Sequence, residues 1–420
     1  MSLGFIPVRA QKYSSAALRA DLDTLYRTLQ EVHPDLFAVA GRPRLDSMVA
    51  ALHARIGRAD SLYGLEFYSY LLPFFEAIGD GHTSLMPVGI PGDAAPSLPF
   101  DVTIPDDSTI RVRRNYRPDS PLPVGTRIDS LDGHSAREVI RRFLVWASGE
   151  RLPFRLALQE WNFPKCYYWW NTWRRDYRIR GTTPDGTILR ETIESIPFRT
   201  RWAEQKAAQR EWPYSLEILS DTTALLTLRA MVGGKQSQAF FDSVFQELRE
   251  RRVPNLIVDL RENSGGATSG GDMLLRYLSD RPFIQIEKGV QRGVPDTLRN
   301  LKKWWHKPHR ARKRYTGQVW MLTSRYTFSS AANLSWAFKY FGMGTVVGEE
   351  TGGLSVAFGN KRIFELSNSG IQYGVSTRLF YEVGATDDDV HGTLPDYPVP
   401  ADEALDYTLR LIRQGSSRVK

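Results

Sequence analysis

At residues 256–266 the sequence reads Leu256-Ile257-Val258-Asp259-Leu260-Arg261-Glu262-Asn263-Ser264-Gly265-Gly266. The first five residues are mostly apolar, which is typical of a central parallel strand that is buried on both faces. Helical and strand patterns alternate around this run from Tyr214 onward, so the sequence predicts an α/β fold. The predicted elements are strand 224–228, helix 240–248, strand 256–260, helix 272–278, strand 318–323, helix 329–340 and strand 345–347.

A second turn of interest lies between the predicted strand 318–323 and the helix that follows it, where the sequence reads Arg325-Tyr326-Thr327-Phe328-Ser329-Ser330. A serine at a strand-to-helix turn exposes its hydroxyl above a sheet edge, and the N–H groups that open the helix can bind an oxyanion. Ser329 is therefore a candidate nucleophile. The alternative is that Ser329 or Ser330 only caps the helix, which is the commoner role of serine before an apolar run.

The composition describes a globular protein rather than a disordered or fibrous one. The chain has 420 residues, 42% hydrophobic and 24% charged, which is enough for two or three domains with a sizeable core. Its single cysteine, Cys166, excludes an internal disulfide and a multi-cysteine metal site, and we interpret it as a buried apolar side chain. No run approaches the ~18 apolar residues that span a bilayer, and residues 1–10 lack the features of a signal peptide. We expect an untargeted chain as given, although its first residues could replace a removed export signal.

The formal charge of +8 is spread widely, but one block from Lys302 to Arg314 holds seven basic residues together with Trp304, Trp305, His306 and His309. Basic residues among aromatic ones can bind phosphate backbones or anionic membranes. No nucleic-acid-binding motif accompanies the block, so we expect a solvated insertion, no nucleic-acid partner, and peripheral membrane contact only as a minor alternative. The basic surroundings of the two histidines argue against a metal site.

The N-terminal part of the chain predicts two further domains. Helical patterns at 15–32, 44–56 and 65–78 indicate a small helical domain over residues 1–88. Short strands follow, and Gly125 to Gly133 reads as a strand with an Asp-Gly turn before the capping box Ser135-Ala136-Arg137-Glu138. This pattern resembles the peptide-binding PDZ fold, so we predict a PDZ-like α+β domain with an aromatic-rich insertion over residues 89–212. The α/β core then covers residues 213–420.

Three segments in order resemble the serine peptidase family that contains the C-terminal processing (tail-specific) proteases, the tricorn core and the interphotoreceptor retinoid-binding protein. They are 259–266, Thr327-Phe328-Ser329, and Gly348-Glu349-Glu350-Thr351-Gly352-Gly353. The helical start, the segment Asp80-Gly81-His82-Thr83-Ser84-Leu85 and the PDZ-like middle also match the family's plan. The resemblance implies a ClpP/crotonase-like α/β core and a serine peptidase, of the endopeptidase or C-terminal processing type, that acts on peptides or proteins. It implies no cofactor and no metal, and it suggests a periplasmic or exported location.

The resemblance also implies roles for individual residues. It places the family's nucleophile on Ser329, with Ser330 as the rival if the turn is one residue longer. The oxyanion would then be held by the backbone N–H groups of Gly265 and Ser330, because glycine lets its backbone approach a substrate closely. Arg261 and Asn263 are expected to brace the glycine turn by hydrogen bonds.

The resemblance implies a catalytic base that differs from that of the processing proteases. They use a lysine shortly after the Gly-Glu-x-Thr segment, where this chain has Leu354. The tricorn-like branch instead takes a histidine from the N-terminal region, which His82 matches, and an acid near a Gly-x-x-Pro-Asp segment. Asp389 matches that acid, although the family normally has glutamate there, and Asp388 or Asp387 are alternatives.

An imidazole can take the proton of a serine hydroxyl and later return it to the leaving amine, which agrees with His82 as the general base. His33 precedes a proline at a helix end and His134 lies in the PDZ-like turn, so both are weaker candidates, while His391 is a second candidate beside the acid segment. Two other functions stay open. The chain could be an inactive peptidase-like protein that binds an apolar ligand or peptide, or an interaction protein that docks on a membrane or an acidic partner.

Overall fold

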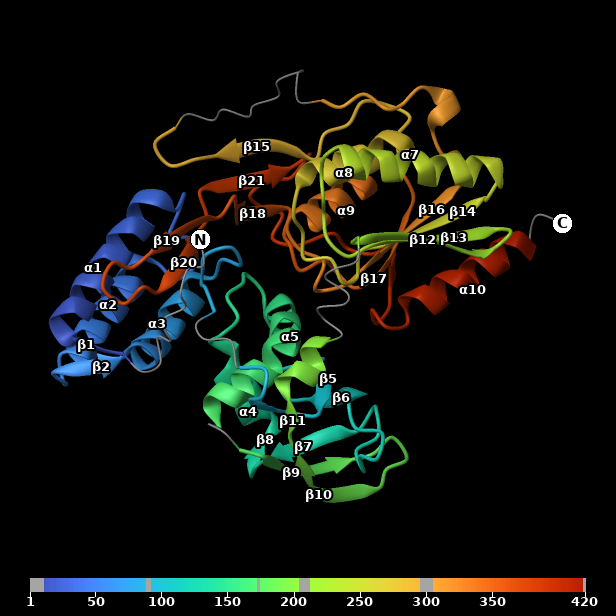
Figure 1. The fold of residues 1–420 in the computed structure, drawn as a ribbon. Coiled ribbons are helices and arrows are strands. Elements are labelled where there is room, and N and C mark those ends of the chain that lie inside the picture. The colour runs from blue at the N-terminus through green and yellow to red at the C-terminus, as the bar shows by residue number, and fades with distance from the viewer. Residues whose placement is uncertain (1–10, 88–91, 172–173, 204–211, 295–304, 418–420) are drawn as a thin grey trace. The chain divides into compact units, whose positions relative to one another are not determined.

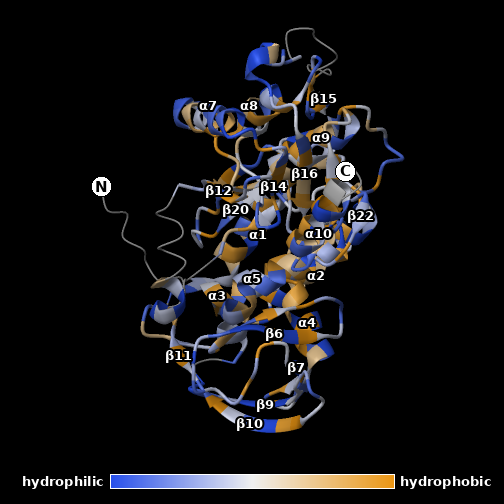
Figure 2. Cartoon of the chain, turned by 90° about the vertical axis from the view of Figure 1, so that its right-hand side faces the viewer, coloured by the Kyte–Doolittle hydropathy of each residue, from blue (hydrophilic) through white to orange (hydrophobic). Residues whose placement is uncertain are grey.

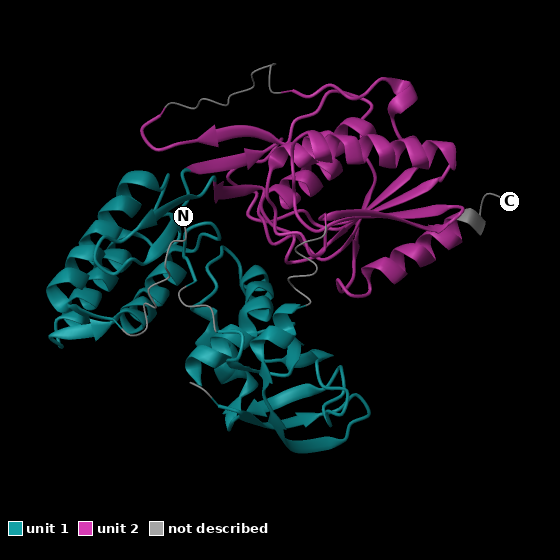
Figure 3. Ribbon diagram, viewed as in Figure 1, with its two compact units in different colours: residues 1–210, 360–377 teal, residues 211–359, 378–420 magenta. Residues whose placement is uncertain are grey.

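The computed structural model describes residues 11–87, 92–171, 174–203, 212–294 and 305–417 (Figure 1). The chain divides into two compact units (Figure 3). Unit 1 comprises residues 1–210 and 360–377, and unit 2 comprises residues 211–359 and 378–420. Lys302, Lys303 and Trp304, at the start of the predicted basic block, lie outside the described residues.

Unit 2 is built on a six-stranded sheet, which confirms the predicted α/β core. In spatial order its strands are β12 (Tyr214–Ser220), β13 (Thr223–Leu228), β14 (Asn255–Asp259), β16 (Gln318–Thr323), β17 (Thr345–Gly348) and β22 (Tyr397–Pro398). β12 runs antiparallel to β13, and all other neighbours are parallel. Every residue of β14 is buried, as expected for a central strand covered on both faces.

Helices cover both faces of this sheet (Figure 1). They are α7 (Lys235–Glu250), α8 (Thr268–Leu278), α9 (Ser330–Tyr340) and α10 (Ala404–Ser417). Leu256 and Val258 of β14 belong to the apolar core that contains residues of α7, α8 and α9, whereas Ile257 packs in a second core with residues of α10. This alternation follows from the two-residue period of a strand. Figure 2 shows α7 with both hydrophilic and hydrophobic residues, as an amphipathic helix requires.

Two three-stranded sheets, formed mostly by strands between residues 286 and 382, were not predicted. In unit 2, β15 (Ile286–Val290), β21 (Arg378–Glu382) and β18 (Val356–Gly359) form a three-stranded sheet in that order. In unit 1, β19 (Arg362–Glu365), β20 (Gln372–Val375) and β3 (Ser84–Leu85) form another. Residues 360–377 therefore belong with unit 1, although the sequence-based division placed them in the core domain.

The helical part of unit 1 follows the predicted pattern closely. Its helices are α1 (Ser15–Val32), α2 (Arg42–Ile56) and α3 (Gly64–Ile78), and β1 (Lys12–Ser14) pairs with β2 (Ser61–Tyr63). The leucines at 18, 22, 25 and 29 of α1 are all fully buried, because their spacing puts them on one face. They share a core with Leu366 and Tyr373 from the 360–377 segment, which explains why that segment belongs to unit 1.

The remaining part of unit 1 is a small α+β region. Its main sheet has the order β10 (Ile188–Glu194), β9 (Asp176–Thr182), β7 (Arg127–Leu131), β6 (Ile110–Asn115), β5 (Phe100–Thr103), with β8 (His134–Ser135) beside β7. A second pair joins β4 (Pro96–Ser97) to β11 (Ile196–Pro197), and the helices are α4 (Ala136–Leu144) and α5 (Leu152–Trp170).

The predicted capping box is present at the start of α4. Ser135 accepts a hydrogen bond from the Glu138 N–H (3.3 Å), and the Glu138 carboxylate accepts one from the Ser135 N–H (2.7 Å). The aromatic-rich stretch contains the helix α5, which the sequence analysis did not predict because Pro164 and the aromatic side chains obscure its periodicity. Cys166 is buried in this helix, as predicted. Among the described residues, no helix combines the length and apolar character needed to cross a bilayer.

Candidate active site

The three segments that carry the resemblance come together in unit 2. Parallel strands end at the same edge of a sheet, so the loops after the neighbouring strands β14, β16 and β17 leave from one edge. Hydrogen bonds join these loops. The Thr327 hydroxyl donates to the Leu260 carbonyl (2.8 Å), the Phe328 N–H to the Asn263 carbonyl (3.1 Å), and the Gly353 N–H to the Thr327 carbonyl (3.2 Å).

Ser329 occupies a strained turn directly before α9. Its backbone has φ +50° and ψ −132°, a conformation that a residue with a side chain rarely adopts. Its side chain is partly exposed and does not cap the helix, so the structure does not support the simple capping role. A nucleophile elbow has this geometry, in which a serine is held in a strained turn between a strand and a helix.

Ser330, the rival nucleophile, has a different environment. It is the first residue of α9 and is only 2% exposed. Its hydroxyl has no hydrogen-bond partner among the residues that the structure describes. The side chain of Ser330 thus points into the protein, while its backbone N–H is one of the unpaired donors at a helix N-terminus.

The glycine turn lies directly against Ser329. Gly265 has φ +106°, and a Cβ at this position would come within 2.7 Å of the Ser329 Cβ and 3.1 Å of the Ser330 nitrogen. Asn263 is buried and braces the turn. Its side-chain oxygen accepts from the Gly265 N–H (2.9 Å), and its amide nitrogen donates to the Leu228 carbonyl (2.9 Å). A side chain at position 265 would therefore collide with the turn that carries Ser329.

The hydrogen bond from Gly265 bears on its expected role as an oxyanion donor. Its N–H is already engaged by Asn263, whereas the Gly266 N–H donates to no described residue. The Gly265 carbonyl accepts from the Met231 N–H (2.9 Å). Because the carbonyl and the following N–H of a trans peptide point in opposite directions within the peptide plane, the Gly266 N–H points away from Met231.

Arg261 braces the end of β14 rather than the glycine turn itself. Its guanidinium binds the carboxylate of Asp259 (Nη2–Oδ2 2.7 Å) and donates to the Ala401 carbonyl (2.7 Å). Arg261 therefore ties the strand to the segment that precedes α10.

The acidic residues predicted from the sequence lie in an exposed loop. Asp389 is 29% exposed, and its carboxylate accepts hydrogen bonds from the N–H (2.7 Å) and hydroxyl (3.0 Å) of Thr386, which lower its pKa. Asp387 is exposed and accepts from the Tyr381 hydroxyl (2.6 Å), and Asp388 is also exposed. The structure gives none of the three a hydrogen bond to the Ser329 turn. Asp389 instead lies 3.8 Å from His391 (Oδ1–Nε2).

A different carboxyl group, that of Glu382 at the end of β21, is linked to the nucleophile turn. Glu382 is only 3% exposed, and burial raises its pKa well above the usual value. When the amide of Asn333 is oriented with its nitrogen toward two acceptors, it donates to Glu382 Oε1 (2.8 Å) and to the Ser329 carbonyl oxygen (2.7 Å). Glu382 Oε2 has no partner among the described residues. The sequence analysis missed Glu382. The sequence signal that could have pointed to it is a single carboxylate directly after the apolar run Leu379-Phe380-Tyr381.

His82 belongs to unit 1, where the loop that carries it is fixed by the fully buried Asp80. Asp80 Oδ1 accepts from the His82 N–H (2.8 Å) and lies 4.0 Å from His82 Nδ1. Asp80 Oδ2 accepts from the Ser376 hydroxyl (2.6 Å) and lies 3.1 Å from His33 Nε2. Burial alone would raise the pKa of Asp80, but the His33 hydrogen bond and the charges of both histidines lower it below the usual value.

The other titratable groups of interest are also located. His33 is buried as a partner of Asp80, and the His134 ring packs on Trp170 (4.6 Å between centroids). Burial, together with the charge of nearby Asp80, raises the pKa of Glu150 to about 8, and the sequence analysis did not single out this residue. Within the described ranges, no group of three or more histidine, cysteine, aspartate or glutamate side chains could hold a metal ion.

Comparison with known proteins identifies the family that the core resembles. Residues 222–399, less than half of the chain, match the model of Peptidase family S41. The tail-specific protease of Haemophilus influenzae is 26% identical over 161 residues, which are 37% of this chain and 21% of that protein. The chain thus matches about a fifth of the length of this curated relative.

Solved structures share the fold over nearly the whole chain. Mature CPAF complexed with lactacystin has a TM-score of 0.69 at 15% identity, with 95% of this chain and 98% of that chain covered. The photosystem II D1 C-terminal processing protease has a TM-score of 0.50 at 13% identity, with 92% and 94% covered. The predicted fold class and the resemblance stated from the motifs are confirmed, since the core is similar to Peptidase family S41 and to a tail-specific protease.

Proposed function

Starting from the S41 match of the core, we propose that this protein hydrolyses peptide bonds through an acyl-enzyme in which Ser329 is the nucleophile. The observation that carries the proposal is the strained and partly exposed Ser329 at the turn before α9. Strain of about 1–3 kcal/mol at a single residue persists only when the surrounding structure enforces it, and such residues cluster at functional sites. Ser330 is excluded from this role in the proposal because its side chain is buried.

We assign the general base to His82. A serine hydroxyl needs a base to attack at neutral pH, and Leu354 replaces the lysine of the processing proteases. His82 is partly exposed, and Asp80 holds its backbone in place. In the proposed reaction the imidazole takes the Ser329 proton as the hydroxyl oxygen attacks the peptide carbonyl, and then returns it to the leaving amine. His391 is the alternative base that the experiment below must separate from His82.

For the acid, the proposal replaces Asp389 with Glu382. Asp389 is partly exposed and its Oδ2 accepts two hydrogen bonds from Thr386, whereas Glu382 is buried and its Oε2 has no partner among the described residues. Through Asn333, Glu382 also holds the backbone carbonyl of Ser329. We propose that the Ser330 N–H is one oxyanion donor. The Gly265 N–H already donates to Asn263, so we propose the Gly266 N–H as the second donor.

The proposed substrate is a peptide or a protein, cleaved either internally or near its C-terminus. A periplasmic or exported location is proposed on the resemblance to the tail-specific protease alone. The experiment compares the hydrolysis of unfolded casein with that of peptides carrying a free or an amidated C-terminus. Cleavage that requires the free carboxylate indicates C-terminal processing, and equal cleavage of both peptides indicates an endopeptidase.

The assignments are tested with Ser329→Ala, His82→Gln and His391→Gln, each checked for an unchanged thermal unfolding midpoint. We expect Ser329→Ala and His82→Gln to lose nearly all hydrolysis and His391→Gln to keep it. Hydrolysis retained in folded Ser329→Ala would discard the nucleophile. Loss in His391→Gln with retention in His82→Gln would move the base to His391.

A further inference from the structure

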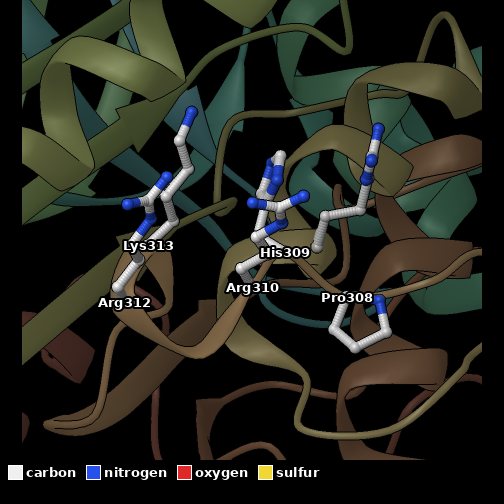
Figure 4. Close-up of a pocket in the computed structure, with 6 residues that line it drawn as sticks. Pro308, His309, Arg310, Arg312 and Lys313 are labelled. Atoms are coloured by element: carbon white, nitrogen blue, oxygen red, sulfur yellow. The ribbon is translucent and has the colours of Figure 1, made fainter.

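A basic pocket in unit 2 is lined by none of the residues assigned to catalysis. It has a volume of about 340 Å³ and is lined by Arg276, Pro308, His309, Arg310, Arg312 and Lys313 (Figure 4). Arg276 lies in the last turn of α8, and the other residues belong to the segment that leads through the short 3-10 helix η2 (Ala311–Lys313) toward β16. Every lining residue except the proline carries a cationic or titratable nitrogen, and none carries a carboxylate.

The positive charge of this pocket is only partly neutralised. Lys313 pairs with Asp242 (Nζ–Oδ1 3.3 Å), and the same carboxylate also accepts from the Tyr277 hydroxyl (2.7 Å). Arg276, Arg310 and Arg312 form no ion pair with any residue that the structure describes. Three guanidinium groups without a counter-charge around one hollow favour binding of an anion, since the arginine fork matches the oxygens of phosphate groups.

The inner wall of the pocket also holds polar atoms without partners. The Arg276 Nε and the His309 Nε2 atoms are buried, and neither has a hydrogen-bond partner among the described residues. The two residues are fixed relative to each other, because the His309 N–H donates to the Arg276 carbonyl (2.8 Å) and the His309 ring packs on Tyr277 (4.3 Å between centroids). Buried polar atoms nearly always have a partner, so a ligand or water is expected at this wall.

We propose that this pocket binds a phosphate-bearing anion, either a free diphosphate-type ligand or the headgroup of an anionic phospholipid. Its volume lies at the lower end of the range of small-molecule sites, which suits a ligand of one or two phosphate groups. The partly buried Arg276 and His309 contact the oxygens deepest in the pocket, and the exposed Arg310 and Arg312 contact those at its rim. This assigns a function to part of the basic block, which the sequence alone predicted to be a solvated insertion.

The test is calorimetric titration of inorganic diphosphate into wild-type protein, Arg276→Gln and the double variant Arg310→Gln/Arg312→Gln at low and moderate salt. Arg251→Gln is the matched control, because this exposed arginine of unit 2 pairs with Glu247 outside the pocket. We expect binding by wild type and the control, about tenfold or more weaker binding by both pocket variants, and loss of affinity with added salt. No binding by wild type, or equal binding by the folded double variant, would overturn the proposal.

Sedimentation with phosphatidylcholine vesicles, with and without phosphatidylglycerol, then identifies the source of the anion. Co-sedimentation that needs phosphatidylglycerol, is lost in Arg310→Gln/Arg312→Gln and is competed by diphosphate indicates a lipid headgroup. Diphosphate binding without co-sedimentation indicates a free ligand. Co-sedimentation without any diphosphate binding would refute the pocket as the binding site.

Discussion

Substitution of Gly265 by alanine tests whether the glycine turn shapes the nucleophile. The new Cβ would lie 2.7 Å from the Ser329 Cβ and 2.9 Å from the Phe328 carbonyl oxygen, whereas ordinary contact begins at 3.4 Å. The turn must therefore retreat by about 0.7 Å, and a misplacement near 1 Å can lower a reaction rate on the order of 10²-fold. The positive φ of residue 265 adds strain of about 1–3 kcal/mol.

The assay measures casein hydrolysis together with urea unfolding, and Gly234→Ala is the matched control. Gly234 also lies in unit 2 with a positive φ of +94°, but a Cβ there meets nothing within 4 Å. We expect Gly234→Ala to lose stability only, and Gly265→Ala to lose more stability and about 10²-fold in activity. Wild-type activity in folded Gly265→Ala would refute the contact between this turn and the active serine.

Three further predictions test other parts of the account. Glu382→Gln is expected to lower kcat/KM by about 10²-fold with little change in the unfolding free energy, whereas Asp389→Asn should keep its activity. Loss of activity in Asp389→Asn with retention in Glu382→Gln would restore Asp389 as the acid. The folded pKa of Glu150, about 8, exceeds the usual 4.5, so the unfolding free energy should fall as pH rises from about 4.5 to about 8. Urea unfolding of Glu150→Gln should lack this component, and an unchanged pH slope would contradict the raised pKa. Asp80→Asn should lower the unfolding free energy by about 1–3 kcal/mol, because Asp80 is buried beside His33. Asp23→Asn, which breaks an exposed pair with a histidine, should lower it by less than about 1 kcal/mol, and equal losses would contradict a stabilising role for the buried Asp80 contacts.

The parts of the fold that the sequence predicted well have one strong periodicity. The leucines of α1 repeat on one face, and Leu256, Ile257 and Val258 form the apolar centre of β14, so each pattern fits a single structure. The turn at Ser329 was predictable because a serine between a strand and a helix has few possible geometries.

Other features depend on contacts that a local pattern does not contain. The hairpin β19–β20 belongs to unit 1 because Leu366 and Tyr373 pack on helices more than 280 residues earlier in the chain. Glu382 was missed because nothing next to it in sequence marks a catalytic acid, and its link to the Ser329 turn passes through Asn333. Asp389 was chosen from its place in a motif, but that position in the structure is an exposed loop.

The central claim is that Ser329 is an activated nucleophile, and the most direct measurement is the intact mass of the protein after incubation with a fluorophosphonate probe. Wild type, Ser329→Ala and Ser330→Ala are compared, each confirmed to be folded. The account predicts a single adduct on wild type and Ser330→Ala and none on Ser329→Ala. An adduct that persists in Ser329→Ala, or no adduct on folded wild-type protein, would contradict it.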